Sequence, residues 1–307
     1  MMLIWGMSVK KEYMNTHDLC IAWNWAPDGD FVRIIENACG LKGLSLLTLT
    51  NENIETMLPL LNNKQMTFRV FFDRASDSNK RFINVDLWAL NNGVHRINTR
   101  ERAFDSCDKI ALHYRLINAG IYTPHTIIIP PYEKQPTLTD IDLKPLGERF
   151  IIKPAHGGGG EGVKKETSSI TQVMIARQEY PADSYLLQDN IRPVQLGLRK
   201  AWFRVLYCYG EVYPCWWNQQ THIYIPVTSE EEQLFGLQPL KSICSKIAAI
   251  CNLELFSTEI ALTEDACFVV VDYVNDQIDL RLQSKAIDGV PDTILHSMAE
   301  HLVDSAV

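Results

Sequence analysis

The first hundred residues alternate between strand signals and helix signals, and this alternation limits the folds that the chain can adopt. Short apolar runs predict buried strands at residues 19–23, 44–49 and 67–72. Amphipathic segments lie between them, and Asp28 or Asp30 is placed to cap the first helix, which Gly40 ends. Strands separated by helices of this length pair in parallel. Residues 15–105 therefore predict a small doubly wound α/β lobe.

The pattern changes after residue 105. Ser106 is placed to cap a further helix, and strand signals follow at residues 126–129, 150–154, 163–167 and 185–188. From Ala201 onward the strands are joined by short turns, which indicates antiparallel hairpins. These hairpins span residues 202–217 and 255–274. The whole chain is thus expected to be an α/β protein with α+β lobes.

The composition is that of a globular protein, with 46% hydrophobic and 21% charged residues. A chain of 307 residues is expected to form two or three lobes. With 29 basic against 37 acidic residues, the net charge of -8 argues against nucleic acid as the main partner. The longest apolar runs span only a few residues, so we expect no segment that crosses a membrane.

Neither the start of the chain nor its cysteines indicate secretion. The apolar residues 1–7 have no preceding basic region, which is atypical of a signal peptide. The 8 cysteines contain no Cys-x-x-Cys pair. Cys244 and Cys251 fall within a helical pattern and are expected in the core. We therefore expect a reducing, cytoplasmic location.

The segment His156-Gly-Gly-Gly-Gly-Glu-Gly162 is the strongest local signal. It formally matches a dinucleotide fingerprint, but that motif opens a helix, and residues 163–167 predict a strand. The Walker pattern fails because Val163 follows the last glycine where lysine is required, and protein-kinase motifs are absent. Two interpretations remain. The segment is either a surface hairpin turn or a loop whose N–H groups wrap a phosphate that Lys153 neutralises.

Acidic side chains gather on two strands near the C-terminus. Glu259 lies in the first strand, Asp272 in the second, and Asn275 and Asp276 just beyond. In a hairpin, Glu259 and Asp272 can face the same way. Carboxylates with an amide carbonyl are hard oxygen ligands that suit Mg²⁺ bridging phosphates, and the alternative is a set of solvated strand residues. Asp272 favours the first reading because it follows the apolar run 268–271, and a buried carboxylate needs a cation or donors.

The order of these motifs resembles the ATP-grasp superfamily of carboxylate–amine and carboxylate–thiol ligases, and is similar to glutathione synthetase and ribosomal-protein glutamate ligases. The resemblance covers about residues 106–285. It implies an ATP-grasp fold behind a doubly wound pre-ATP-grasp domain. The implied domains are the N-terminal domain, a small lobe with the glycine loop and a large lobe with the metal site, at residues 1–105, 106–187 and 188–307.

The resemblance also implies a role for each matching residue. Lys109 and Lys153 match lysines that contact the ATP phosphates, and the loop that closes over them matches Gly157, Gly158, Gly159, Gly160 and Gly162. The adenine-binding hinge matches Gln188, Asp189, Asn190 and Ile191, and the ribose position matches Gln195. Arg204 matches the arginine that stabilises the transferred phosphoryl group, and Lys153 is implied as a second catalytic residue. The metal ligands match Glu259, Asp272 and Asn275.

Two departures from the family pattern affect this assignment. Trp202 stands where ribosomal-protein glutamate ligases carry an aspartate, two residues before the arginine. The final motif, Asp272-Tyr-Val-Asn275, has one residue more than the usual acid-x-Asn. Either a bulge realigns Asn275, or Asp276 replaces it as the third metal ligand.

The reaction that the resemblance implies is an ATP-dependent ligation. A carboxylate attacks the γ-phosphate to give an acylphosphate, which an amine of a small molecule or peptide then displaces. ATP and Mg²⁺ are the implied cofactors, with two Mg²⁺ ions expected, and Mn²⁺ and a homodimer remain open. The alternatives are a small-molecule kinase of the same fold and a nucleotide-binding module without ligase activity.

The acceptor site is the least defined part of the sequence. Arg74 follows a strand of the first lobe, at the edge where α/β sheets bind ligands, and is placed to clamp a carboxylate. A surface ion pair is the alternative. Arg281 follows the metal motif and is a second candidate for the acceptor pocket.

Overall fold

The computed structural model describes residues 15–138 and 141–307, which form two compact units. The first unit combines the N-terminal part of the chain, up to Ile97, with residues 296–307, and the second unit comprises residues 98–295. The apolar residues 1–7 discussed above lie outside the described residues. Within the described ranges, no helix has the length and apolar character needed to cross a membrane.

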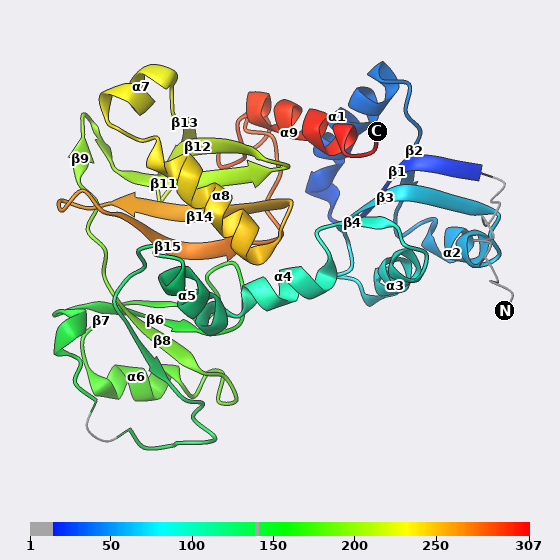
Figure 1. The fold of residues 1–307 in the computed structure, drawn as a ribbon. Helices are drawn as coiled ribbons and strands as arrows, with labels where there is room; N and C mark the ends of the chain where they lie inside the picture. The colour runs from blue at the N-terminus through cyan, green and yellow to red at the C-terminus, as the bar shows by residue number, and fades with distance from the viewer. Residues whose placement is uncertain (1–14, 139–140) are drawn as a thin grey trace, which may run out of the picture. The chain divides into compact units, whose positions relative to one another are not determined.

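The first unit is built on a parallel sheet with the strand order β2-β1-β3-β4 (Figure 1). Its strands are β1 (Asn15–Trp23), β2 (Leu46–Leu49), β3 (Met66–Arg74) and β4 (His95–Ile97). Its helices are α1 (Gly29–Leu41), α2 (Ile54–Asn62) and α3 (Ile83–Asn91), and most of α9 (Asp292–Asp304) also belongs to this unit. The expected parallel α/β lobe is thus present, because buried strands alternate with helices that supply apolar side chains to the sheet.

The start of α1 differs from the expectation. Asp28 precedes the helix, but its side chain makes no capping hydrogen bond. Its carboxylate instead accepts hydrogen bonds from Nε and Nη2 of Arg74, at 2.9 and 2.8 Å. A buried charge pair between Asp28, directly before α1, and Arg74, at the end of β3, therefore replaces the predicted cap, because a buried guanidinium needs a compensating carboxylate.

The second unit contains two antiparallel sheets (Figure 1). The smaller has the order β5-β8-β6-β7, from β5 (Thr126–Ile129), β6 (Phe150–Pro154), β7 (Lys164–Thr167) and β8 (Tyr185–Asp189). The larger has the order β13-β12-β11-β14-β15, from β11 (Trp202–Cys208), β12 (Glu211–Trp217), β13 (Tyr224–Pro226), β14 (Leu255–Leu262) and β15 (Phe268–Asn275). A two-stranded ribbon joins the sheets in sequence, from β9 (Gln195–Leu196) and β10 (Arg199–Lys200).

The helices of the second unit are α4 (Arg100–Cys107), α5 (Lys109–Asn118), α6 (Ile170–Ala176), α7 (Ser229–Leu234) and α8 (Pro239–Cys251). Of these, α5, α6 and α8 contribute buried apolar side chains to the cores beside the sheets. In α8 the residues that face the large sheet are buried, including Cys244 and Cys251, which confirms their expected place in the core. Burial raises the pKa of both thiols, so they remain protonated apolar groups.

The cap of α5 corrects the sequence prediction. Ser106 belongs to the last turn of α4, and its hydroxyl is buried. Asp108 is the residue that caps α5, since its side chain accepts hydrogen bonds from the backbone N–H groups of Ile110 and Ala111. The prediction of Ser106 was wrong because α4 was not expected immediately before α5. Asp108 separates the two helices, and its cap sets the start of α5 at Lys109.

Candidate active site

A cavity of about 900 Å³ in the second unit is lined by residues of both sheets. The residues predicted from the sequence that line it are Lys109, Lys153, Gly157, Gly158, Gly159, Gly160, Asn190, Ile191, Glu259, Asp272, Asn275 and Asp276. Such a volume is within the range that protein sites use for cofactors and small substrates. The fold thus gathers phosphate-binding and metal-binding candidates, far apart in sequence, around one space.

The glycine segment is a loop between β6 and β7, as its position in the sequence predicted. Gly157, Gly159, Gly160 and Gly162 all have positive φ angles, which side chains with a Cβ rarely adopt. A Cβ on Gly162 would also lie 2.7 Å from Cε2 of Tyr180 and 3.0 Å from Cγ of Pro154. The glycines are therefore required by the backbone path that brings the loop over the cavity.

Two side chains hold the ends of this loop. Lys109 donates a hydrogen bond from Nζ to the carbonyl oxygen of Gly157 at 2.6 Å. At the other end, the hydroxyl of Tyr180 donates to Oε1 of Glu161 at 2.9 Å, and this bond raises the pKa of Tyr180 to about 12. These two bonds tie the ends of the loop to α5 and to the chain that follows α6.

Lys153 connects the two sheets across the cavity. It lies on β6, and its ammonium donates to the carbonyl oxygen of Val271 on β15 at 2.9 Å. Burial lowers the pKa of Lys153, and the neighbouring carboxylates of Asp272 and Glu259 oppose that shift. A cation held here faces the carboxylates and is available to a phosphate that enters the cavity.

Arg204, Glu259 and Asp272 occupy one row across three neighbouring strands. Arg204 on β11 pairs with Glu259 on β14, and Glu259 pairs with Asp272 on β15. Because side chains directly opposite one another share a face of the sheet, the three groups are adjacent. Arg204 Nη1 donates to Glu259 Oε1 at 2.8 Å, and burial raises the pKa of Glu259 while Arg204 opposes the rise. Glu259 lines the cavity and Arg204 does not, so Arg204 is linked to the cavity through its hydrogen bond to Glu259.

The extra residue in the last motif is accommodated by an irregular pairing of β14 and β15. Ser257 pairs with Asn275 and Glu259 with Asp272, so β15 uses one residue more than β14 over this stretch. A bulge of this kind reverses the alternation of side chains. Asn275 consequently reaches the same side as Asp272 and donates from Nδ2 to Asp272 Oδ2 at 2.9 Å. Asp276 also lines the cavity.

The donor set at this edge fits Mg²⁺. In the described part of the chain, no group of three His, Cys, Asp or Glu side chains is arranged to hold a metal ion by itself. Magnesium typically takes one or two carboxylates together with phosphate oxygens of a nucleotide. Glu259 and Asp272 would supply two hard anionic ligands, with an amide oxygen of Asn275 beside them, and such a set fits this kind of binding.

The hinge residues divide into two groups. Asn190 and Ile191 line the cavity, whereas Gln188 is only 1% exposed and does not. The amide of Gln188 donates to the hydroxyl of Tyr273 at 2.8 Å and to Thr126 at 3.0 Å. In this structure its side chain therefore joins β8 to β5 and β15 from within the core rather than facing the cavity.

Asp189, next to Gln188 in the hinge, also lies away from the cavity lining. Its Oδ1 is buried and has no hydrogen-bond partner among the described residues. Burial raises the pKa of this carboxyl group. Gln195 is exposed in the β9–β10 ribbon, where its amide donates to the carbonyl oxygen of Gly197 at 3.2 Å.

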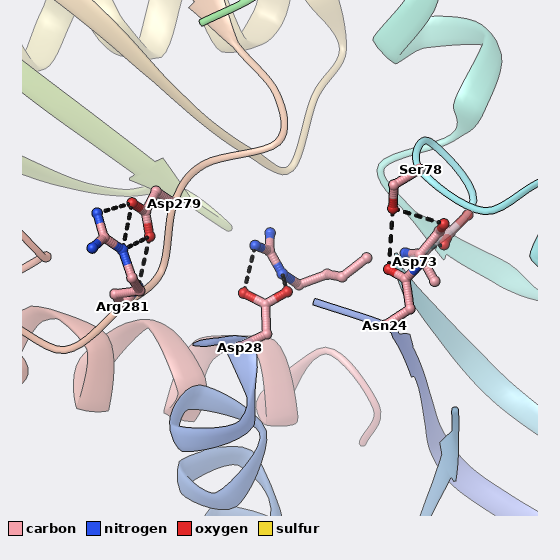
Figure 2. Close-up of polar contacts among 8 residues, drawn as sticks. Asn24, Asp28, Asp73, Ser78, Asp279 and Arg281 are labelled. Atoms are coloured by element: carbon pink, nitrogen blue, oxygen red, sulfur yellow. Dashed lines mark hydrogen bonds and ion pairs between the residues drawn. The ribbon is translucent and has the colours of Figure 1, made fainter. Parts of the chain in front are cut away.

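The two arginines proposed for the acceptor are both held by carboxylates of the chain itself. Figure 2 shows the contact of Arg281 with Asp279. Arg74, in the first unit, is 4% exposed and binds Asp28 with two hydrogen bonds. Arg281, in the second unit, forms ion pairs with Asp279 at 2.6 Å and Asp288 at 2.9 Å. Neither lines the cavity.

Sequence reasoning did not single out several cations and amides of the lining. Arg192, Lys165 and Lys200 contribute positive charge, and Gln219 and Gln220 contribute amides from the loop after β12. Lys165 lies on β7 next to the glycine loop, where the polar run Lys164-Lys-Glu166 gives no alternation that would indicate which face it occupies. The two glutamines lie in a turn whose sequence gives no signal of what it faces.

Solved structures resemble this arrangement over nearly the whole chain. The ATP-grasp ligase PsnB complexed with minimal precursor, Mg and ADP is 14% identical, with 94% of this chain and 97% of that chain covered and a TM-score of 0.60. The D-alanine–D-alanine ligase of Bacillus anthracis complexed with ATP is 13% identical, with coverages of 95% and 97% and a TM-score of 0.63. The chain has the ATP-grasp fold. A RimK domain ATP-grasp protein of Sphaerobacter thermophilus agrees, at 17% identity, coverages of 93% and 98% and a TM-score of 0.61.

The ATP-grasp fold predicted from the order of the motifs is thereby confirmed. No protein-family model and no curated protein matches the sequence itself. At this level of identity the shared property is the fold. In this ATP-grasp fold, residues of both the small and the large antiparallel sheet line the cavity.

Proposed function

We propose that this chain is an ATP-dependent ligase that joins a carboxylate to an amine through an acylphosphate. The observation that carries this proposal is the cavity lined by Lys109 of α5, by Lys153 and the glycine loop of the small sheet, and by two carboxylates of the large sheet. Cations and freed N–H groups suit a triphosphate, and paired carboxylates suit the metal that accompanies it. A site for plain nucleotide storage has no need of an arginine held against a metal-binding carboxylate.

The roles of the chain's residues follow from their positions. Lys153 and Lys109 neutralise the phosphates, and Lys109 exchanges its bond to the Gly157 carbonyl for one to a phosphate oxygen. The loop of Gly157 to Gly162 then covers the nucleotide and excludes water. Asn190 and Ile191 contact the base from the hinge. Gln188, Asp189 and Gln195 remain candidates for base and ribose contacts only if the hinge rearranges, because none of them lines the cavity.

Glu259, Asp272 and Asn275 would hold Mg²⁺, with Asp276 as the alternative third ligand. When bound, Mg²⁺ neutralises the phosphate charge and polarises the phosphoryl group. Arg204 holds Glu259 through a hydrogen bond. Its positive charge lies next to that carboxylate and stabilises the negative charge that develops on the transferred phosphoryl group.

The chemistry proceeds in two displacements. An oxygen of the acceptor carboxylate attacks the γ-phosphorus, and the bond to the β-phosphate oxygen breaks to release ADP. The nitrogen of an amine then attacks the acyl carbon, loses a proton, and displaces phosphate. The complexes of PsnB with a precursor peptide and of a D-alanine–D-alanine ligase with ATP support small-molecule or peptide substrates for a cavity of this kind.

The test is a screen of amino acids and peptides for ADP release in the presence of hydroxylamine. Hydroxylamine converts an acylphosphate into a hydroxamate, which is detected directly. We expect ADP and hydroxamate to appear together with the correct acid. ADP with a phosphorylated alcohol and no hydroxamate would indicate a kinase, and nucleotide binding without turnover for any acid would indicate a binding module.

A further inference from the structure

Both oxygens of the Glu259 carboxylate are held by donors from β11. Arg204 Nη1 donates to Oε1 at 2.8 Å, and the indole Nε1 of Trp202 donates to Oε2 at 2.9 Å. Trp202 and Arg204 are two residues apart on the same strand, so they face the same side of the sheet. The carboxylate is thus fixed against rotation by two donors in one row.

The indole contributes a property that the guanidinium lacks. It donates one hydrogen bond without bringing a charge, and its ring is only 5% exposed, so it is itself held by packing. A carboxylate has about four acceptor positions, and the two donors use two of them. Glu259 lines the cavity, so its remaining acceptor positions stay available to a cation.

We propose that Trp202 is a positioning residue that orients Glu259 for a divalent cation. This inference rests on the proposed function, because it requires a nucleotide-linked metal at Glu259. A ligand already fixed in one orientation loses less conformational entropy when the cation binds, so the N–H donor should be visible in metal affinity.

The chain contains a matched control for this arrangement. Trp216, on β12, donates from Nε1 to Glu231 Oε2 at 2.9 Å, and Arg199 forms an ion pair with the same carboxylate. Trp216 is 3% exposed, and neither it nor Glu231 lines the cavity. Both tryptophans therefore combine burial with a hydrogen bond to a glutamate that an arginine also holds, but only Trp202 lines the cavity and is linked to the candidate metal ligand.

The experiment compares the full-length wild type with Trp202→Phe and Trp216→Phe. Each protein is titrated with Mn²⁺ in the presence of a saturating non-hydrolysable ATP analogue, and free Mn²⁺ is measured by electron paramagnetic resonance. We expect Trp202→Phe to raise the Kd for Mn²⁺ about 10- to 100-fold. Trp216→Phe should leave this Kd unchanged, and both variants should bind the analogue without metal as the wild type does.

An unchanged Kd in Trp202→Phe would overturn the inference, as would equal weakening in both variants, which would show a loss of packing. If Trp202→Phe shows no cooperative melt, Trp202→Met removes the same donor with a side chain that adapts to irregular space. If the wild type and Trp202→Phe bind the analogue and Mn²⁺ equally well, only this inference is overturned. A wild type that binds neither overturns the proposed function as well.

Discussion

Gly162 packs against the ring of Tyr180 so closely that a methyl group at its Cα would lie 2.7 Å from a ring carbon. The contact lies where the glycine loop rejoins β7, and the tyrosine also holds Glu161. One end of a loop that we expect to move is thus fixed by close packing, which localises the motion to the glycines before it.

Replacing Gly162 by alanine should disturb this anchor more than the same change at Gly160. Both positions have positive φ angles, so each substitution costs about 1–2 kcal/mol of backbone strain. Only Gly162→Ala adds a clash with Tyr180 and Pro154, since nothing lies within 4 Å of a Cβ at Gly160. Thermal melts and limited proteolysis of the loop, with and without Mg-ATP, measure the difference. Equal effects of the two substitutions would show that the contact with Tyr180 does not constrain the loop.

Asp272→Asn should abolish most catalysis while the protein remains folded. The change removes one anionic ligand and preserves the shape of the side chain, so kcat should fall on the order of 10²-fold or more. Asp265→Asn is the control, because Asp265 is exposed in the turn of the same hairpin. Turnover of ATP and a thermal melt of each variant are needed. A lower melting temperature with activity retained would assign Asp272 a structural role instead.

Arg74→Met should destabilise the first unit rather than weaken substrate binding. Asp28 is 1% exposed, and removal of its partner leaves an uncompensated buried carboxylate at a cost of about 3–5 kcal/mol. Denaturant unfolding measures this loss, and the double variant with Asp28→Leu should recover much of it. If stability is unchanged but KM for the carboxylate substrate rises, Arg74 belongs to the acceptor site after all.

The stability of the protein should fall at mildly acid pH because of His113. Nδ1 of His113 and the hydroxyl of Tyr273 share a hydrogen bond of 2.7 Å, and the same hydroxyl accepts a hydrogen bond from the amide of Gln188. Burial lowers the pKa of His113 below 6.5, and nearby His125 adds to the shift.

The sign of this effect follows from proton uptake by the unfolded chain. Its histidine binds a proton first, so the stability contribution is complete above about pH 6.5 and is lost as pH falls through the lower pKa of the folded state. We expect His113→Asn to show a flatter melting temperature between about pH 7 and 5. An unchanged pH profile in the variant would assign the acid sensitivity to other groups.

Local periodicity was enough to predict the parallel first lobe, the hairpins and the glycine loop between two strands. These features depend on the spacing of apolar residues and on short turns, which are properties of neighbouring residues. Cys244 and Cys251 were placed in the core for the same reason. The order of the motifs then indicated the fold, although each motif alone was degenerate.

Partners distant in sequence could not be predicted in this way. The side chain of Gln188 forms a hydrogen bond with Tyr273, which lies on a different sheet, and Arg74 forms an ion pair with Asp28. The pattern of a single strand reports which side chains face inward but not which group meets them. Trp202 stood out only as a departure from the family, and its bond to Glu259 required the register of β11 and β14.

The position of residues 296–307 in the first unit determines how the protein can be divided into fragments. Residues 98–295 form a continuous piece, so a single stretch of gene encodes the whole cavity and all its lining residues. The first unit has no such continuity, since Met298, Leu302 and Val303 of α9 are buried and belong with it. A fragment that ends at Ile97 would lack these side chains, whereas a circular permutation that joins residues 296–307 to the N-terminal portion would make that unit contiguous.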